Sequence, residues 1–269
     1  MSVPDLANVL VVKIGGGAGL NLDLCADDLA QLARQRPIVV VHGVSERMNA
    51  LCAERGIEVK TLVSPTGHAS RYTDAPTRDV FVEAALSVND DLRSALQQRG
   101  VDSVCISDAI HATRKDAVRA VVDGRVRIVR DDYTGTISHI TSAGILEALE
   151  RGLVPVIPPY ATSPDGALNV DGDRASAALA AALHAETLVI LSNVRGLYRD
   201  IQDASSFVAH ISPSQLEVAM EWAQGRMKRK VLGAQEALEG GVRRVIIGDG
   251  RAEQPISAAL AGHGTEFSA

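Results

Sequence analysis

The first residues that could do chemistry are a lysine and a group of glycines near the amino terminus. The stretch 9–19 reads VLVVKIGGGAG, an apolar run that contains Lys13 and ends in glycines at positions Gly15, Gly16, Gly17 and Gly19. Glycine allows a sharp turn that brings backbone N–H groups close to an anion, and the lysine adds positive charge. The combination indicates a phosphate site, although an ordinary strand-to-helix turn beside a lysine explains it equally well.

Known phosphate-binding motifs do not match this stretch. The Gly-Lys-Ser or Gly-Lys-Thr ending of a Walker A loop is missing. Leu20 follows Gly19, so the spacing of the dinucleotide-binding fingerprint also fails. The interpretation therefore depends on the position of Lys13 near the carboxyl end of a buried strand, where open α/β sheets bind their ligands.

A second stretch with the same plan follows at residues 37–43. PIVVVHG ends in His42 and Gly43, then passes through Val44 into a helical sequence. The repetition suggests a second turn that faces an anion.

An arginine lies in the stretch 57–74, which we expect to be irregular. Arg71 could clamp a carboxylate through two parallel N–H donors. It could also form a surface ion pair with Asp74, and the frequency of such pairs favours this second interpretation.

Length and composition limit the class of protein. With 269 residues and 46% hydrophobic content, the chain can form one large α/β domain or two lobes. A net charge of −6 argues against nucleic-acid and membrane-surface proteins, and no apolar run is long enough to span a membrane. Three widely spaced cysteines, no metal-ligand cluster and no signal peptide over residues 1–8 indicate a cytoplasmic protein.

Apolar runs and helical periods alternate along the chain. Strands are expected in the stretches 9–19, 37–43, 101–107, 153–160, 186–198 and 242–250. Helices are expected over 24–36, 46–56 and 76–99, and after residues 173, 225 and 255. This alternation predicts a three-layer αβα sandwich with a mainly parallel central sheet.

The segment 111–130 carries an unusual concentration of positive charge. Its centre, AVRAVVDGRVRIV, alternates apolar and basic residues about Asp123 and Gly124, which predicts a hairpin. The cations are Arg114, Lys115, Arg119, Arg125, Arg127 and Arg130. An edge ribbon kept soluble by arginine and a docking surface for an acidic partner explain this pattern equally well.

Polar residues mark three later element ends. Asn169 and Asp173 flank the start of an alanine-rich helix, where they could be caps or could place an amide and a carboxylate in a site. Ser192 and Asn193 end the next strand, a usual place for nucleotide contacts. The run GRMKRK at 225–230 opens a helix with cations, which oppose the helix macrodipole, and such local conflicts often mark function.

Taken together and in this order, the segments resemble the amino-acid kinase superfamily, and within it the acetylglutamate kinase family, over about residues 9–265. The chain is most similar to the kinases of amino-group-carrier-protein pathways, which phosphorylate carrier-linked 2-aminoadipate or glutamate. The residues that carry this narrower similarity are DYTGT at 132–136, LSNV at 191–194 with 196–197, AQGRMKRKV at 223–231, and the segments 249–251, 255–256 and 262–265.

The resemblance implies the amino-acid kinase fold, with an acceptor-binding N-terminal lobe over about 1–170 and an ATP-binding C-terminal lobe over about 171–269. It implies that Lys13 and Lys230 neutralise the transferred phosphoryl group from either side, and that Asp173 orients both lysines. Such charge neutralisation suits phosphoryl transfer, and an attacking carboxylate needs no general base.

The resemblance also implies the contacts of both substrates. Backbone N–H groups of Gly15, Gly16 and Gly43 would serve the phosphoryl group and the acceptor carboxylate, with Val44 beside them. Arg71 would hold the α-carboxylate of the substrate and Asn169 its amide. The site for ATP and its bound Mg²⁺ would be lined by Ser192, Asn193, Gly196, Leu197, Gly225, Met227 and Lys228.

Partners follow from the same resemblance. The carriers of this family are acidic, so the basic segment from Arg114 to Arg130 is the expected docking surface. The first strand begins by about Val9, which leaves no room for the N-terminal helix of arginine-inhibited hexameric relatives. We therefore expect a homodimer without arginine inhibition.

One position departs from the family pattern. A second glycine usually follows the histidine and glycine of the second turn, and here that position is Val44. If the position needs a positive φ or a close ligand, a β-branched side chain is costly there. A kinase for free N-acetylglutamate and a non-catalytic nucleotide or amino-acid sensor therefore remain alternatives, and the lysine, arginine or specialised-metabolite pathway stays open.

Overall fold

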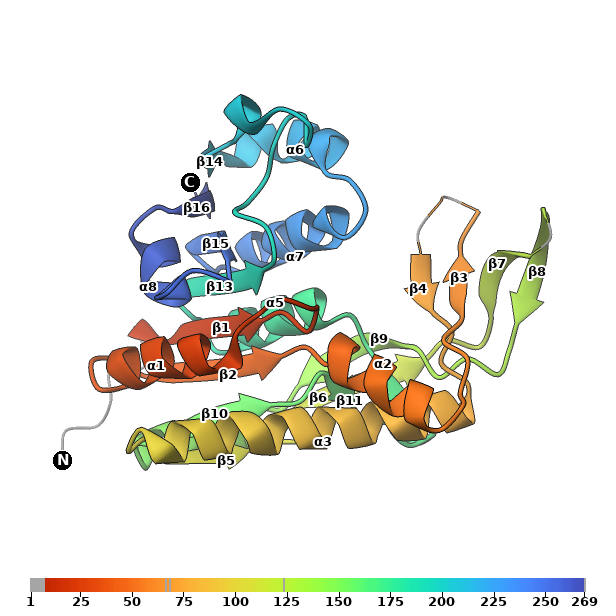
Figure 1. Ribbon diagram of the computed structural model, residues 1–269, viewed down its shortest axis with the longest axis horizontal. Coiled ribbons are helices and arrows are strands. Elements are labelled where there is room, and N and C mark those ends of the chain that lie inside the picture. The colour runs from red at the N-terminus through yellow and green to blue at the C-terminus, as the bar shows by residue number, and fades with distance from the viewer. Residues whose placement is uncertain (1–7, 66, 68, 123, 269) are drawn as a thin grey trace.

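A computed structural model describes residues 8–268 except 66, 68 and 123. Eight strands form one central sheet in the order β14-β16-β15-β13-β1-β2-β10-β5 (Figure 1). Only the pair β15 and β16 is antiparallel. The strands are β14 (His210–Ile211), β16 (Gly264–Ser268), β15 (Arg244–Asp249), β13 (Thr187–Ser192), β1 (Leu10–Ile14), β2 (Ile38–His42), β10 (Val154–Ile157) and β5 (Ser103–Cys105).

Helices cover both faces of the sheet because its central strands are apolar on both sides. In β1, Leu10 and Val12 face one core, together with α1 (Leu22–Ala33), α3 (Ala75–Gln98) and α8 (Pro255–Leu260). Val11 faces the other core, which α4 (Ala143–Glu150), α5 (Gly172–Ala182), α6 (Leu216–Trp222) and α7 (Met227–Glu239) complete. The predicted three-layer α/β fold with a mainly parallel sheet is confirmed.

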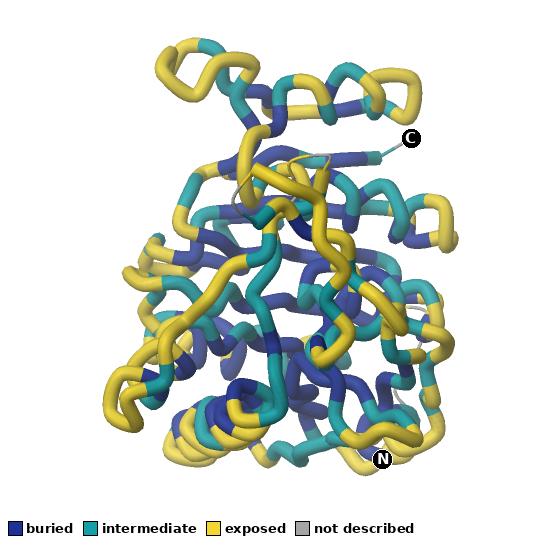
Figure 2. The backbone as a smooth tube through the Cα atoms, turned by 90° about the vertical axis from the view of Figure 1, so that its right-hand side faces the viewer, coloured by how far each residue is buried: buried dark blue, intermediate teal, exposed yellow. Residues whose placement is uncertain are grey.

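Two hairpins stand side by side at one end of the molecule, next to α2 (Ser45–Glu54) (Figure 1). The predicted basic hairpin is confirmed as β7 (Val118–Val122) paired with β8 (Arg125–Val129), although Asp123 of its turn lies outside the described residues. The expectation of an irregular stretch over 57–74 was wrong, because β3 (Thr61–Val63) and β4 (Ala69–Arg71) pair there. Figure 2 views these hairpins from the front, where most of their backbone is exposed ahead of the buried sheet.

Several further elements were not predicted from the sequence. They are β14 and β16 of the central sheet, α4, α6, two short 3₁₀ turns (Ala204–Ser206 and Pro213–Gln215), and the antiparallel pairs β6 (Ile110–Arg114) with β9 (Gly135–Ile140) and β11 (Tyr160–Ala161) with β12 (Leu168–Asn169). The expectation that a short helix from Pro255 closes the chain was therefore wrong. The pair β6–β9 supports the base of the basic hairpin. The bridge between Thr134 and Asn169 joins this region to the strand that precedes α5.

A buried carboxylate connects the two ends of the chain. Asp28 on α1 is fully buried and accepts hydrogen bonds from the backbone N–H groups of Ile256 (2.7 Å) and Ser257 (2.8 Å). It therefore caps the N-terminus of α8, whose own cap residue, Gln254, forms no side-chain cap. A carboxylate in this position satisfies otherwise orphaned donors and complements the helix dipole.

We predict that Asp28→Ala lowers the free energy of unfolding by about 2–4 kcal/mol, because it leaves buried N–H donors without an acceptor. Urea denaturation followed by circular dichroism measures the change. The matched control is Asp27→Ala on the same helix, since Asp27 is exposed and pairs only with Arg99. Equal effects of the two substitutions would contradict the capping role.

Candidate functional site

One buried carboxylate holds two lysines together at the carboxyl edge of the sheet. Lys13 lies near the end of β1, Asp173 in the first turn of α5 and Lys230 in the first turn of α7. The Nζ atom of Lys13 is 2.8 Å from Oδ1 of Asp173, and that of Lys230 is 3.0 Å from Oδ2. The side-chain burial of all three residues is nearly complete, with 7–9% of each residue exposed.

Local packing explains why these groups meet. The cap of α5 is Asp171, whose side chain accepts from the N–H groups of Asp173 and Arg174. The alternative in which Asp173 is only a cap is therefore wrong, and its carboxylate is free to face the lysines. Gly233 lets α7 approach α5 closely, because a Cβ atom there would lie 3.1 Å from the carbonyl oxygen of Asp173.

The charged groups of this cluster shift one another's pKa values. Burial alone would raise the pKa of Asp173, but the two neighbouring ammonium groups hold it well below its usual range. Burial and the charge of Lys13 lower the pKa of Lys230, which the carboxylate of Asp173 partly counteracts. Two cations and one anion leave an excess positive charge at the sheet edge, which suits an anionic ligand.

The two glycine turns contact each other directly beside this cluster. A Cβ atom on Gly16 would overlap the backbone of Gly43 and Val44, and a Cβ atom on Gly43 would overlap Gly16. The N–H group of Glu46 donates to the carbonyl of Gly16 (2.8 Å) and that of Gly43 to the carbonyl of Ile14 (2.8 Å). Only glycine permits this approach.

These contacts correct one predicted role. The N–H group of Gly43 was expected to serve an anion, but in this structure it is already bonded to the carbonyl of Ile14 at the end of β1. Among the described residues, no acceptor receives the N–H groups of Gly15 and Gly16. The backbone donors that remain for an anion therefore lie on the first turn.

Val44 fits its position without strain. Its φ is −137°, so the position does not require the left-handed conformation that would favour glycine. The side chain is buried in a small core with Met48, Phe81 and Tyr160. The expected cost of a β-branched residue from a positive φ is therefore not present.

His42 supports the second turn from the protein core. It is buried beside Asn89, whose amide Nδ2 is 3.2 Å from Nε2 of the ring. Nδ1 is 3.4 Å from the carbonyl oxygen of Gly43, so the neutral ring with a proton on Nδ1 suits both contacts. Burial lowers the pKa of His42 to about 4, which keeps the ring neutral at pH 7.

Arg71 is not paired with Asp74, so the favoured ion-pair interpretation was wrong. Asp74 instead caps α3 by accepting from the N–H group of Thr77 (3.0 Å). Nη2 of Arg71 donates to Oδ1 of Asn49 (2.7 Å), while its buried Nη1 atom has no partner among the described residues. Arg71 therefore keeps a donor for a ligand.

Asn169 lies in the same region through Thr73, a residue that was not singled out from the sequence. Nδ2 of Asn169 donates to Oγ1 of Thr73 (3.0 Å), and Thr73 is fully buried two residues after Arg71. The N–H group of Tyr133 donates to the carbonyl of Thr73, and the carbonyl of Tyr133 accepts from the N–H group of Asn169. No local sequence signal marks Thr73, because this contact joins segments 96 residues apart.

The residues expected around ATP lie in the segment 192–197, at and after the end of β13, and at the start of α7. Gly196 and Leu197 pack against β16, where the N–H group of Leu197 donates to Oγ1 of Thr265 (2.8 Å) and a Cβ atom on Gly196 would overlap that side chain. Ser192 is buried and Asn193 is exposed at the end of β13. At the start of α7, Gly225 has a φ of 51°, Met227 is half-buried and Lys228 is exposed. Their roles toward a nucleotide remain predictions.

The cations of the basic segment from Arg114 to Arg130 differ in exposure and in their contacts. Lys115, Arg119, Arg125, Arg127 and Arg130 are exposed, and none forms an ion pair within the described part of the chain. Arg114 differs, because it stacks on the ring of Tyr133 at 3.8 Å and donates to the carbonyls of Arg130 and Asp132. Arg114 therefore fixes the base of the hairpin, and its docking role stays a prediction.

Comparison with known proteins places this arrangement in a family. Residues 8–249 match the amino acid kinase family. This chain belongs to the amino acid kinase family. Two similar relatives are a "[LysW]-aminoadipate kinase" from Deinococcus radiodurans, 44% identical with 98% of this chain and 92% of the relative covered, and one from Thermus thermophilus, 40% identical with 96% and 99% covered.

Solved structures of this amino acid kinase fold are also similar. N-acetylglutamate synthase from Neisseria gonorrhoeae superimposes with a TM-score of 0.79 at 26% identity, over 98% of this chain and 60% of the synthase chain. Carbamate kinase from Giardia lamblia gives a TM-score of 0.71 at 15% identity, over 97% and 98% of the two chains, and supports the fold alone. Within the described residues, no helix of this kinase-family chain has the length and apolar character needed to cross a membrane.

We predict that acid weakens this amino acid kinase through His42. Because burial lowers the pKa of His42 from 6.5 to about 4, the unfolded chain binds the proton first as the pH falls. Stability is therefore full above pH 6.5 and is lost toward pH 4, by about 3 kcal/mol in total.

Urea denaturation at intervals from pH 7.5 to 4 tests this pH dependence. His42→Asn should reduce the slope between pH 6.5 and 4, whereas His263→Asn, which changes an exposed histidine, should keep it. An unchanged slope in His42→Asn would show that other groups cause the acid sensitivity.

Proposed function

We propose that this protein transfers the γ-phosphoryl group of ATP to the side-chain carboxylate of 2-aminoadipate, or of glutamate, attached to an acidic amino-group carrier protein. The product is an acyl phosphate. The observation that carries this proposal is the buried Lys13–Asp173–Lys230 cluster beside the free N–H groups of the first glycine turn. The two similar carrier-dependent kinases, at 40% and 44% identity over nearly the whole chain, support the choice of acceptor.

The geometry suits this reaction because two anions must meet. A carboxylate oxygen of the acceptor forms a bond to the γ-phosphorus while the bond to the β,γ-bridging oxygen breaks and ADP leaves. Lys13 and Lys230 both pair with the carboxylate of Asp173, which positions them so that both can neutralise charge on the transferred group. The attacking carboxylate is already ionised at pH 7, which removes the need for a general base.

The residues at the sheet edge fit the polyphosphate of ATP. The unbonded amides of Gly15 and Gly16 and the ammonium groups of Lys228 and Lys230 in the first turn of α7 provide the donors that such a ligand needs. Within the described residues, no group of three or more metal-ligating side chains could hold an ion. We therefore propose that Mg²⁺ enters with the nucleotide, where it shields phosphate charge.

The acceptor side is supported by Arg71, Asn169 and the turn at Val44. Arg71 keeps an unbonded buried donor for the α-carboxylate, and Asn169 is fixed by Thr73 near it. The negative φ of Val44 removes one argument for a non-catalytic sensor, the cost of a β-branched residue at a positive φ. A homodimer and a cytoplasmic location remain predictions.

The experiment that tests the function measures ATP turnover and traps acyl phosphate with hydroxylamine. We expect hydroxamate with an acidic carrier that bears aminoadipate or glutamate, and little with free N-acetylglutamate. Hydroxamate from free N-acetylglutamate alone would instead identify an N-acetylglutamate kinase. ATP binding without product from either acceptor would favour the sensor.

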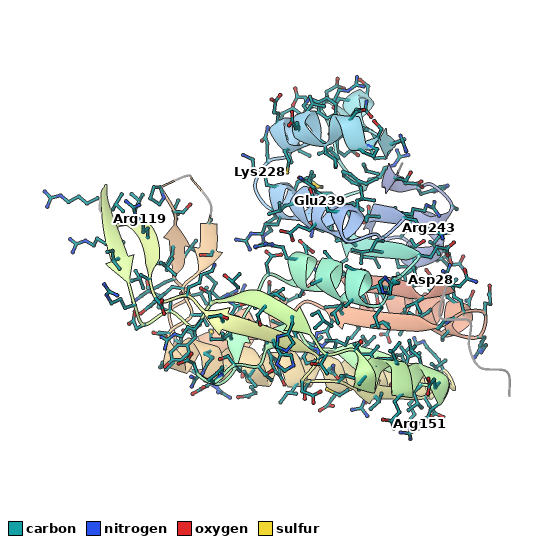
Figure 3. The ribbon with its side chains drawn as sticks, turned by 180° about the vertical axis from the view of Figure 1, so that it is seen from behind. Asp28, Arg119, Arg151, Lys228, Glu239 and Arg243 are labelled. Carbon is teal, nitrogen blue, oxygen red and sulfur yellow. The ribbon has the colours of Figure 1, made fainter. Side chains whose placement is uncertain are left out.

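We further propose that the exposed cations of the hairpin β7–β8 dock the carrier. Arg119 on β7 and Arg125 and Arg127 on β8 belong to this hairpin, where Figure 3 labels Arg119. Arg119 is paired with Ile128, so exposed Val126 and Ile128 share its face of the hairpin, whereas Arg125 and Arg127 lie on the other face. The face of Arg119 can therefore bury apolar area as well as pair charge. The hairpin stands at the same end of the sheet as Arg71.

The triple reversal of Arg119, Arg125 and Arg127 to Glu should raise KM for the carrier at least about 10-fold and leave KM for ATP unchanged, because several charge contacts become repulsive. The matched control reverses three exposed arginines elsewhere, Arg34, Arg151 and Arg243, with the same change in net charge. Unchanged carrier kinetics in the hairpin variant, or equal loss in the control, would refute docking on this surface.

A further inference from the structure

Arg226 lies beside the first glycine turn, and its charge acts on Arg71, which comes from a distant segment of the chain. Arg71 ends β4, and Arg226 immediately precedes α7. Nη1 of Arg226 lies 3.6 Å from the position that a Cβ atom on Gly17 would occupy. Nη1 of Arg71 is buried and has no hydrogen-bond partner among the described residues.

A third arginine fixes the relative position of these two. The guanidinium group of Arg229 on α7 donates to the carbonyl of Ala69 on β4 and lies 3.3 Å from Oδ2 of Asp171. Ala69 is two residues before Arg71, and Arg229 is about one helical turn after Arg226. The contact therefore brings β4 and the start of α7 together, and with them Arg71 and Arg226.

The convergence leaves positive charge without an anion. Arg226 forms no ion pair with any described residue, and its charge opposes the positive end of the α7 macrodipole. Burial lowers the pKa of Arg71, and the nearby charge of Arg226 lowers it further. The neighbouring carboxylates are already engaged, since Asp171 pairs with Arg229 and Asp173 with the two lysines.

We propose that Arg226 is the second arm of a carboxylate clamp whose first arm is Arg71. The ligand is a carboxylate of the acceptor that is not phosphorylated, and its binding ties α7 to β4 in the acceptor-bound enzyme. This inference depends on the proposed function for the identity of the acceptor. Two planar guanidinium groups offer more N–H donors and more positive charge to one carboxylate than Arg71 alone, which already uses one donor on Asn49.

The carboxylate has two possible sources with the same chemistry. It can be the α-carboxylate of the attached amino acid, or a carboxylate of the carrier near the attachment point. N-acetyl-2-aminoadipate carries only the first, whereas the carrier-linked acceptor carries both. Comparing these two probes therefore identifies the source.

The experiment measures binding of both probes and of ATP by calorimetry to the wild type, Arg71→Gln, Arg226→Gln and the double variant. Arg226→Gln should weaken acceptor binding at least about 10-fold and change ATP binding by less than about 2-fold. The double variant should lose less than the product of the two single effects, because both arginines hold one group. Arg226→Gln should not lower the melting temperature, since it removes a cation from a helix N-terminus.

The control is Arg243→Gln, which changes an exposed arginine at the opposite end of the C-terminal half from Lys228 and the α7 start (Figure 3). This variant should bind all three ligands as the wild type does. Arg226→Lys should recover part of the affinity lost in Arg226→Gln, because it restores the charge without the planar donor pair.

Each outcome of the binding measurements supports or refutes the clamp formed by Arg71 and Arg226. Weaker binding of both acceptors assigns the clamp to the α-carboxylate, and weaker binding of the carrier-linked acceptor alone assigns it to the carrier. Unchanged acceptor binding, or an equal loss for ATP, would overturn the clamp. A wild type that binds N-acetyl-2-aminoadipate but phosphorylates no acceptor would refute the proposed function only, and one that binds neither acceptor would refute both.

Discussion

A single buried carboxylate holds the reaction centre of this fold together. Asp173 neutralises one of the two positive charges that Lys13 and Lys230 bring into a nearly water-free site. Without it, two ammonium groups would face each other in a low-dielectric environment, where repulsion is strong. The capping of α5 by Asp171 and the close approach of α7 at Gly233 both serve this contact, because they set the distance between the three side chains.

The second constraint is the contact between the two glycine turns. Gly16 and Gly43 leave no room for any side chain, so the ends of β1 and β2 approach more closely than other residues would allow. That approach brings the free amides of the first turn toward the lysine cluster, and the neutral, buried His42 supports the second turn from the core. Positive charge and backbone donors therefore converge on one point, as transfer of a phosphoryl group requires.

Around this centre, the acceptor side is held by contacts that cross large sequence distances. Thr73 links Arg71 to Asn169, and Tyr133 links both to the base of the basic hairpin, where Arg114 stacks on its ring. The turn that contains Tyr133 therefore connects the basic hairpin to Arg71 and Asn169. The hairpin β3–β4 contacts α7 through Arg229, so the segments that flank the acceptor also bridge the two halves of the chain.

The sequence alone determined the fold class, the positions of the main strands along the chain and the candidate lysines and glycines, whereas the order of the strands in the sheet came from the structure. Apolar β-branched runs that end in glycine have few structural alternatives, and Lys13 is placed by its own strand. Only the tertiary structure decided which donors are free. The amide of Gly43 is bonded to the end of β1, Arg114 donates to carbonyls at the base of the hairpin, Asp74 caps a helix instead of pairing with Arg71, and Val44 avoids a positive φ. These outcomes depend on partners far away in the chain, and local composition carries no information about such partners.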